Sequence, residues 1–501
     1  MRKKILIKGP LLSRSGYGEQ ARFALESLLS RDDLFDIYVM NIGWGNTGHI
    51  SDIEQRTKID QLVHKTGEYM QSGGTFDVSL QVTIPNEFEK IAPVNIGYTA
   101  GIETTKVAPE WIEKCNATVD RVVVVSEHSR KVFEATKYDV QDQNGNTVPN
   151  WGMTVPVKSV NYSVREATPE DVDITFETDK NFLVVSQWGP RKNVDNTIRW
   201  FVETFADDET VGLVLKTNLV GDSYIDREHV EIRLLGLLSN YPDRKCKVYL
   251  VHGELSAGQL NTLYTHETMQ GMINIGHGEG FGLPLFEAAC AGLPLITITW
   301  SGQNDFICTT NKKGKRYPRV VKVDYDLKPV QKSSVWKGVI TEDSMWAYPK
   351  ETSFKRALTE CIEKQTHYRH EAAALQKHIQ KEFTATKKHA EFVEFVYGES
   401  TVQTPVEDLP KVSIITSVYD AADTIEGFME DLTNQTIFEE KCELVLVNAN
   451  PPGLDYEEDV INKYMEKYPN NIVYERLEED PGIYAVWNRA VELSTGEFIT
   501  N

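Results

Sequence analysis

Short apolar runs alternate with amphipathic stretches along the first part of the chain. The Val122–Val125 run lies between polar residues, as expected for a strand that is buried on both faces of a parallel sheet. The alternation predicts a doubly wound α/β domain over residues 1–165. The segments expected as strands are 5–7, 36–40, 94–98 and 121–126, and the first helix is expected over 19–29.

A second series of the same kind follows, and it predicts a second Rossmann-like domain over 180–345 that faces the first across a cleft. The polar stretch 165–180 has no apolar period and is expected to connect the two. The strands are expected at 181–186, 211–215, 247–251, 272–275 and 295–298, with helices near 196–205 and from about Pro284.

The remaining 155 or so residues divide into three parts by pattern. Residues 346–400 are mainly helical in character and are expected to pack back across both domains. Residues 401–410 have the composition of a linker. Residues 411–501 begin a third α/β unit, with strands expected near 412–418 and 443–447. The basic span 310–337 has no clear pattern and is left unassigned.

Composition and charge narrow the classes of function. Hydrophobic residues make up 41% of the 501 and charged residues 25%, as in a globular protein. The formal charge of −21 argues against nonspecific nucleic-acid binding. Residues 411–501 contain 6 Lys or Arg and 19 Asp or Glu, so most of the excess lies there, which marks them as a separate module.

Neither the cysteines nor the apolar segments indicate a metal site, a disulfide framework or a membrane span. The six cysteines are widely spaced. The most apolar long window, 283–300, contains Glu287 and two prolines. We expect a cytoplasmic protein, with peripheral contact at the inner face of a membrane as an option.

The sharpest motif is the glycine-rich segment from Gly278 to Ile296. Glycines 278, 280 and 282 allow close approach of the backbone to a ligand, and Pro284 suits the first turn of the helix that follows. The N-terminus of that helix would bind a diphosphate. Glu279 and Glu287 place two carboxylates nearby, which suit sugar hydroxyl groups.

This segment resembles the donor-binding signature of the retaining, glycogen-synthase-like glycosyltransferases of family 4, which have the GT-B fold. The resemblance implies that Glu279 lies by the transferred sugar and that Glu287 binds the ribose of the nucleotide. The amides near Gly282 and Leu283, together with Phe281, are the implied contacts to the rest of the donor.

A second match is the segment from Ser186 to Asn193. The family commonly has Gly-Arg at 186–187 and then a lysine, and Arg and Lys together hold the donor diphosphate. Lys192 keeps the lysine position, Gln187 replaces the arginine, and Arg191 is the candidate replacement for its charge. Cations are needed there because the leaving diphosphate gains negative charge.

Further donor-side candidates are Lys216, which closes a predicted strand, and Gly253, which lies in a segment that resembles the family's base-side strand end, where the backbone meets the nucleobase. Both belong to segments placed at the carboxyl ends of predicted strands. His252, next to Gly253, is expected to be structural.

The N-terminal glycine loop, with Gly16 and Gly18, resembles the family's loop that approaches the donor phosphates. It also satisfies a relaxed dinucleotide fingerprint. Against an NAD site, the loop continues eight residues past Ile7, and the second strand ends at Asn41 where an acidic residue is expected. The segment 97–105 resembles the acceptor-side loop of related enzymes, which makes Glu103 the acceptor-side candidate, although family members often have a histidine near this position.

Residues 411–501 resemble the first part of an inverting GT-A glycosyltransferase of family 2, through the segments 411–425 and 480–501. The family usually has an Asp pair where this chain has Asn448 and Asn450. Its metal-binding Asp motif normally follows the position of Asn501, so we expect this unit to be inactive as it stands, and the chain to be a cut through a longer, bifunctional protein.

Together these features predict an α/β protein with a GT-B fold plus a truncated GT-A-like unit. The expected function is retaining, metal-independent transfer of a hexosyl group in polysaccharide biosynthesis, with no cofactor in the GT-B part. A divalent metal is expected only for a complete GT-A module. The donor would be a UDP- or GDP-sugar, and the acceptor a glycan, a lipid-linked glycan or a protein. Two alternatives remain: a nucleotide-sugar epimerase or hydrolase of GT-B fold, and a non-catalytic glycan-binding or assembly protein.

Overall fold

The computed structural model describes residues 2–141, 145–165, 167–310, 313–398, 410–435, 437–453 and 456–501. The chain forms two compact units, Met1–Tyr397 and Gly398–Asn501.

The first unit begins with a six-stranded parallel sheet in the order β2-β1-β3-β4-β5-β8. Its central strands are almost wholly buried, as expected for a sheet covered on both faces. The strands are β1 (Lys3–Gly9), β2 (Phe35–Asn41), β3 (Val78–Val82), β4 (Val94–Thr99), β5 (Arg121–Val124) and β8 (Val157–Ser159), and the helices among them are α1 (Gly16–Leu29), α2 (Ile53–Gln71), α3 (Pro109–Thr118) and α4 (Glu127–Ala135).

A second six-stranded parallel sheet has the order β11-β10-β9-β12-β13-β16. This is the strand order of the dinucleotide-binding Rossmann fold. The direction in which successive strands are added to the sheet reverses between β9 and β12. The strands are β9 (Lys180–Gln187), β10 (Val211–Asn218), β11 (Lys247–Val251), β12 (Met269–Asn274), β13 (Leu295–Ile298) and β16 (Val321–Val323), and the helices are α5 (Val194–Thr204), α6 (Tyr224–Leu238), α7 (Ala257–Thr265), α8 (Leu283–Cys290) and α9 (Asn304–Ile307).

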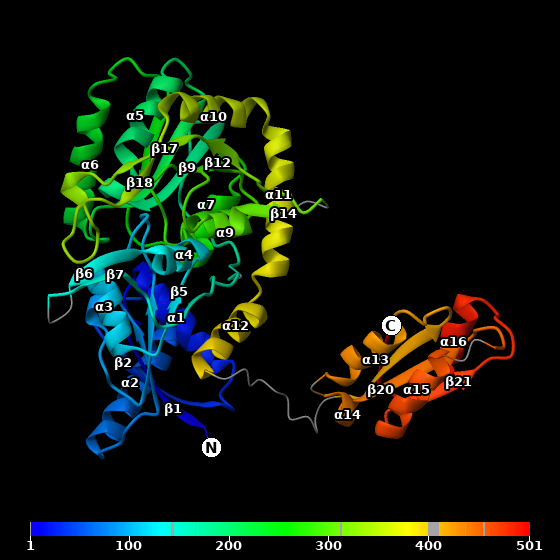
Figure 1. The fold of residues 1–501 in the computed structure, drawn as a ribbon. Coiled ribbons are helices and arrows are strands. Elements are labelled where there is room, and N and C mark those ends of the chain that lie inside the picture. Colours follow the sequence, from blue (N-terminus) through cyan, green and yellow to red (C-terminus); the bar gives the residue numbers. More distant parts are fainter. Residues whose placement is uncertain are drawn as a thin grey trace. The chain divides into compact units, whose positions relative to one another are not determined.

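Three consecutive helices close the first unit: α10 (Glu351–Glu363), α11 (Gln365–Glu382) and α12 (Ala385–Tyr397). Figure 1 shows them passing from the second sheet to the first, with α10 packed on α5, α11 on α8 and α12 on α1. The helical segment begins later than expected, because residues 346–349 belong to β18 (Met345–Pro349), which pairs with β17 (Tyr325–Pro329).

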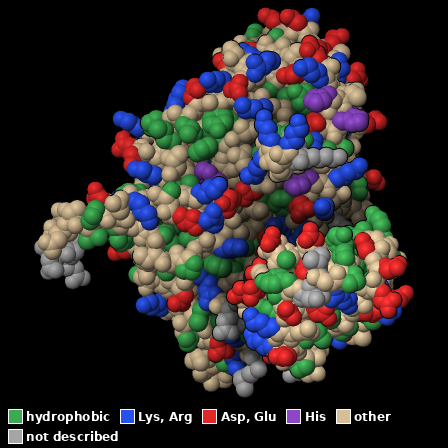
Figure 2. All heavy atoms as spheres, turned by 45° about the vertical axis from the view of Figure 1, so that its right-hand side comes forward, with side chains coloured by type: hydrophobic (Ala, Val, Ile, Leu, Met, Phe, Trp, Pro, Cys, Tyr) green, Lys and Arg blue, Asp and Glu red, His purple; other side chains and the backbone are tan. Residues whose placement is uncertain are grey.

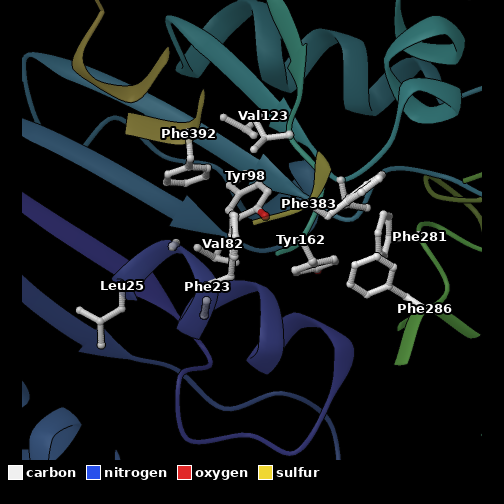
Figure 3. Packing of buried hydrophobic residues seen from close by; sticks show 14 of the residues in the cluster. Phe23, Leu25, Val82, Tyr98, Val123, Tyr162, Phe281, Phe286, Phe383 and Phe392 are labelled. Atoms are coloured by element: carbon white, nitrogen blue, oxygen red, sulfur yellow. The ribbon is translucent and has the colours of Figure 1, made fainter. Parts of the chain in front are cut away.

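An aromatic cluster joins the two sheets and the closing helices (Figure 3). Phe23 of α1 packs edge-on against Tyr162 and Phe392, with ring centroids 5.5 and 5.6 Å apart. Tyr162 continues to Phe281 at 5.2 Å, and Phe281 to Phe286 at 5.1 Å. The core therefore runs through the junction between the sheets, so both halves of the unit share one packed interior.

The second unit has a four-stranded parallel sheet in the order β21-β20-β19-β22. Its core is built mainly from β20, whose residues are all buried. The elements are β19 (Val412–Val418), α13 (Ile425–Thr433), α14 (Phe438–Lys441), β20 (Cys442–Asn448), α15 (Tyr456–Lys467), β21 (Ile472–Arg476), α16 (Ile483–Leu493) and β22 (Phe498–Thr500).

Three antiparallel strand pairs are not expected from the sequence pattern, namely β17–β18, β6–β7 (Lys137–Gln141 and Thr147–Gly152) and β14–β15 (Cys308–Thr310 and Arg316–Pro318). Strands β15 and β17 lie within the basic span 310–337, for which the sequence predicts no element. Of the predicted linker 401–410, only Pro410 is within the described residues.

Charged side chains of both signs are interspersed on the face in Figure 2. No helix in the described part of the chain has the length and apolarity needed to cross a bilayer.

Candidate active site

The candidate site lies where the strand order of the second sheet reverses. Lys192 ends a 3₁₀ turn (Pro190–Lys192) soon after β9, and Glu279 lies in the loop after β12. These strands are neighbours in the sheet, so their carboxyl ends present the two loops side by side. This is where ligands bind in open α/β sheets.

Glu279 is the centre of a buried charge cluster, with a side chain only 6% exposed. Lys192 Nζ donates to both of its oxygens, at 2.7 and 2.8 Å, and Arg191 Nη1 donates at 3.1 Å. Asn274, the last residue of β12, donates to it at 3.0 Å. Its own backbone N–H donates to Ser301 Oγ at 2.8 Å, which fixes the loop. The carboxylate is thus held in one orientation.

The charges in this cluster stabilise one another. Burial by itself would raise the pKa of Glu279, but Lys192 and Arg191 outweigh it and lower that pKa to about 2. Burial lowers the pKa of Lys192, and Glu279 opposes that effect. Glu279 is therefore ionised at neutral pH. The positive charges of Lys192 and Arg191 balance its negative charge.

Arg191 extends the cluster to the other half of the unit. Its Nη2 lies 3.3 Å from Glu103 Oε1, and its Nη1 donates to the carbonyl oxygen of Gly278 at 2.6 Å. Glu103 follows β4 of the first sheet. The predicted acceptor-side residue and the predicted donor-side cation are therefore in contact, whereas Gln187 donates to the carbonyl oxygen of Leu219 instead.

Helix α8 begins beside Glu279, as its glycines predict. Gly282 precedes it with φ +95°, a left-handed conformation that favours glycine, and it has no side chain to cap the first turn. Leu283 is the first helical residue and Pro284 the second. The N-terminus of α8, with its partial positive charge, is thus available to an anion.

Glu287 lies one turn into α8 and is half-buried. It accepts a hydrogen bond from the hydroxyl group of Tyr264, on α7, at 3.1 Å. Burial raises the pKa of Glu287 to about 7, the charge of Glu19 adds to this, and the charge of Arg165 opposes it. The two predicted glutamates therefore differ strongly in acidity, because Glu279 has cations within contact and Glu287 does not.

The N-terminal glycine loop is held by a network that the sequence did not indicate. Arg22 donates to the backbone carbonyl oxygens of Leu11 and Ser13, at 2.7 and 2.9 Å. It also pairs with Glu19, which pairs with Arg165 in the segment between the sheets. A buried arginine thus ties the loop to that segment through Glu19.

The two glycines of this loop have different roles. A Cβ on Gly18 would lie 1.9 Å from the carbonyl oxygen of Ser13, so only glycine fits. A Cβ on Gly16 would meet no atom within 4 Å. The backbone N–H of Gly18 donates to the capping side chain of Ser15 at 3.1 Å. Gly18 therefore shapes the turn, and Gly16 leaves space at the helix start.

Lys216 and Gly253 lie together, as their strand-end positions predict. Lys216 Nζ donates to the carbonyl oxygen of Gly253 at 2.7 Å. Arg14, from the glycine loop, reaches the same end of the second sheet and pairs with Asp222 at 3.2 Å and Glu254 at 2.9 Å. These pairs hold the two halves of the unit together here.

Two neighbouring residues are structural. The side chain of Phe281 is 3% exposed and packs in the aromatic cluster of Figure 3, so only its backbone can face a donor. His252 Nε2 lies 2.9 Å from the buried Asp226, which also accepts from the amides of Leu219 and Val220. His252 is thus partnered in the interior, as expected.

Each unit is similar to known proteins. Residues 413–501 match the family model described as Glycosyl transferase family 2. The poly(ribitol-phosphate) beta-glucosyltransferase of Bacillus spizizenii is 35% identical over 89 residues, which are 18% of this chain and 14% of that protein. The minor teichoic acid biosynthesis protein GgaB of Bacillus subtilis is 33% identical over 87 residues, 17% of this chain and 9% of that protein. The matched region thus spans a small part of either relative.

The first unit is similar to solved structures. Sucrose-phosphate synthase from Thermosynechococcus elongatus has a TM-score of 0.51 at 12% identity, over 79% of this chain and 98% of that chain. A glycosyltransferase from Rickettsia africae has a TM-score of 0.51 at 12% identity, over 80% and 99%. The first unit therefore has the GT-B fold, and residues 413–501 are similar to glycosyltransferases of family 2. The fold expected from the sequence is confirmed.

In the second unit, Asn448 and Asn450 are buried at the end of β20. Asn450 Oδ1 accepts from the backbone N–H of Asp420 at 2.7 Å, so it joins β20 to the loop after β19. No cluster of three or more metal-ligating side chains occurs among the described residues of the chain.

Proposed function

We propose that the GT-B unit is a glycosyltransferase that moves a hexosyl group from a UDP- or GDP-sugar to a glycan acceptor, with retention of configuration. The observation that carries this proposal is the cluster of Lys192, Arg191 and Glu279 beside the free N-terminus of α8. Two cations and a helix dipole close together would stabilise a leaving diphosphate, and this supports the proposal.

In this mechanism the donor diphosphate binds to Lys192, Arg191 and the amides near Gly282. The negative charge of the diphosphate then neutralises part of the positive charge of Lys192 and Arg191, which Glu279 neutralises when no donor is bound. Glu287 accepts hydrogen bonds from the ribose hydroxyl groups, and Glu279 positions the transferred sugar. Lys216 and Gly253 border the nucleobase, and Gly16 and Gly18 border the phosphates from the other half of the unit.

The acceptor hydroxyl oxygen forms its bond to the anomeric carbon on the face that the diphosphate leaves. The bond from that carbon to the phosphate oxygen breaks, and the hydroxyl proton passes to the departing phosphate oxygen. Because cations of the protein neutralise the diphosphate, the proposed reaction requires no metal ion. That residues 411–501 are inactive by themselves stays a prediction of the sequence.

The direct test is NMR analysis of the products formed from UDP- and GDP-sugars with and without oligosaccharide acceptors. Retention at the anomeric carbon of a transfer product is the expected result. The proposal would be contradicted by a transfer product that requires Lys192 for its formation and has inverted configuration at the anomeric carbon. Isomerisation or hydrolysis without acceptor would favour the epimerase or hydrolase, and glycan binding without nucleotide binding would favour an assembly protein.

A further inference from the structure

The hairpin β14–β15 and the start of β16 carry a concentration of positive charge on an acidic protein. Between Cys308 and Val323 the sequence contains six Lys or Arg and no Asp or Glu, although the whole chain has a formal charge of −21. The side chains of Lys313, Lys315, Arg316 and Lys322 are exposed. We call residues 313–322 the basic hairpin.

One of its cations holds the basic hairpin in place. Arg319 Nη1 donates to Glu371 of α11 at 2.8 Å, and its Nε donates to Thr309 Oγ1 at 2.8 Å. The hairpin is therefore fixed to the GT-B unit. The positive charge around it has no part in the donor site described above.

A cavity of about 510 Å³ adjoins the basic hairpin and is lined by Arg316. Arg130 of α4, which is paired with Glu127 and Glu134, and Lys158 of β8 also line it, together with Ser159, Asn161 and three carboxylates. One of the carboxylates, Asp305 of α9, accepts from the amide of Glu127 and from Asn161 Nδ2, each at 2.8 Å. Both halves of the unit thus build this cavity.

The lining fits a ligand that has both phosphate and hydroxyl groups. Guanidinium and ammonium groups bind phosphate oxygens, while carboxylates and amide oxygens accept hydrogen bonds from hydroxyls. A ligand with only anionic groups would be repelled by the carboxylates. A polyol or sugar phosphodiester satisfies both kinds of group.

The surroundings favour a polymer in solution over a membrane. Proteins that lie on a bilayer insert apolar or aromatic side chains beside their cations. Among the described residues between Leu235 and Leu327, no large hydrophobic side chain is exposed. Residues 313–322 of the basic hairpin therefore offer charge and no exposed large hydrophobic side chain to insert.

We propose that the basic hairpin and the adjoining cavity bind a polyol- or sugar-phosphodiester chain and hold it as the acceptor polymer. The role as acceptor rests on the proposed transferase function. The hairpin follows α9, and Ser301, three residues before α9, accepts the hydrogen bond from the amide of Glu279. A phosphodiester polymer bound here is held by the same segment that carries the active site. The local concentration of the polymer at the active site is thereby raised.

Binding is tested by fluorescence anisotropy with a labelled ribitol-phosphate oligomer on the full chain. The double variant Lys313→Glu/Lys315→Glu is compared with Lys58→Glu/Lys90→Glu, which makes the same charge change at exposed residues of the first half. We expect the hairpin variant to bind at least about tenfold more weakly at low salt, with a shallower salt dependence. The control should stay within about twofold of wild type.

Equal binding by wild type and the hairpin variant would overturn the proposal. So would tighter binding to anionic lipid vesicles or single-stranded RNA than to the oligomer, with the same dependence on the hairpin. Transfer to the oligomer is measured alongside nucleotide binding, which the hairpin variant should leave unchanged. If the oligomer binds through the hairpin but wild type transfers sugar to no acceptor, the transferase function fails and the phosphodiester site stands.

Discussion

Lys192 donates to both carboxylate oxygens of Glu279, at 2.7 and 2.8 Å, and so joins the loops after two neighbouring central strands. The pair is buried, with the carboxylate 6% and the lysine 18% exposed. A buried pair of this kind keeps each charge in place. An incoming diphosphate can then share the lysine without any rearrangement of the backbone.

Lys192→Ala should reduce kcat/KM for transfer by at least about 100-fold, because it removes a charge that stabilises the leaving diphosphate. Steady-state kinetics with a nucleotide-sugar donor measure the effect. Lys58→Ala, at an exposed position of α2, is the matched control and should transfer at the wild-type rate. Wild-type kinetics in Lys192→Ala would remove the residue from the mechanism.

Nucleotide affinity should depend on pH through Glu287, whose pKa is raised to about 7. Ribose hydroxyls donate to the ionised carboxylate, so affinity should fall as pH drops from about 8 to 6. Glu287→Gln should bind more weakly at pH 8 and show a flatter pH profile. Identical pH profiles for the two proteins would show that Glu287 does not contact the nucleotide.

The same raised pKa has a consequence for stability. Between the usual glutamate value of 4.5 and about 7, the folded protein keeps a proton on Glu287 that the unfolded chain releases. This contribution makes the unfolding free energy fall as pH rises through that window, by about 3 kcal/mol at most. Glu279, with a pKa of about 2, has the opposite sign, and its stabilisation is lost as pH falls from 4.5 toward 2. Thermal unfolding of Glu287→Gln at pH 5 and pH 8 should show a smaller difference than wild type.

Gly18→Ala should destabilise the glycine loop, because its Cβ would lie 1.9 Å from the carbonyl oxygen of Ser13. We expect a loss of about 1–3 kcal/mol in unfolding free energy, measured by denaturant titration. Gly16→Ala, two residues away, has open space around its Cβ and should change stability by less than about 1 kcal/mol. Equal effects of the two substitutions would mean that the loop does not depend on this close approach.

Transfer by the GT-B unit should persist in EDTA, because Lys192 and Arg191 supply the positive charge that a metal would otherwise provide. The rate with EDTA is compared with the rate after addition of excess Mg²⁺ or Mn²⁺, and the two should agree within about twofold. Loss of transfer in EDTA that added metal restores would contradict the proposed mechanism.

The sequence predicts that Lys192 and Glu279 both belong to the donor site, because each follows an apolar run that forms a central parallel strand, but it does not predict their direct contact. The Glu19–Arg165 pair could not be predicted from the sequence, since Arg165 lies in a polar stretch without periodicity and its partner is 146 positions earlier. Strand β3 was also missed. Its buried Ser79 and Gln81 interrupt the apolar run, and their side chains are satisfied by Asn95 and by the backbone of Glu89.

The acidity of Glu287 was likewise beyond sequence reasoning. Its spacing from Glu279 suggests two equivalent carboxylates, but the difference in pKa arises from cations that tertiary structure places beside only one of them. The basic span 310–337 gave no pattern because its strands are three to five residues long, too short for a periodicity to be seen.

The central claim is that the GT-B unit binds a nucleotide sugar through the loops after β9 and β12 and through α8. Calorimetric titration of UDP and GDP into wild type, Glu287→Ala and the control Lys58→Ala tests it most directly. We predict that wild type and the control bind one of the two nucleotides with the same affinity and that Glu287→Ala loses at least about tenfold. Binding of neither nucleotide by wild type, or equal binding by Glu287→Ala, would contradict the claim.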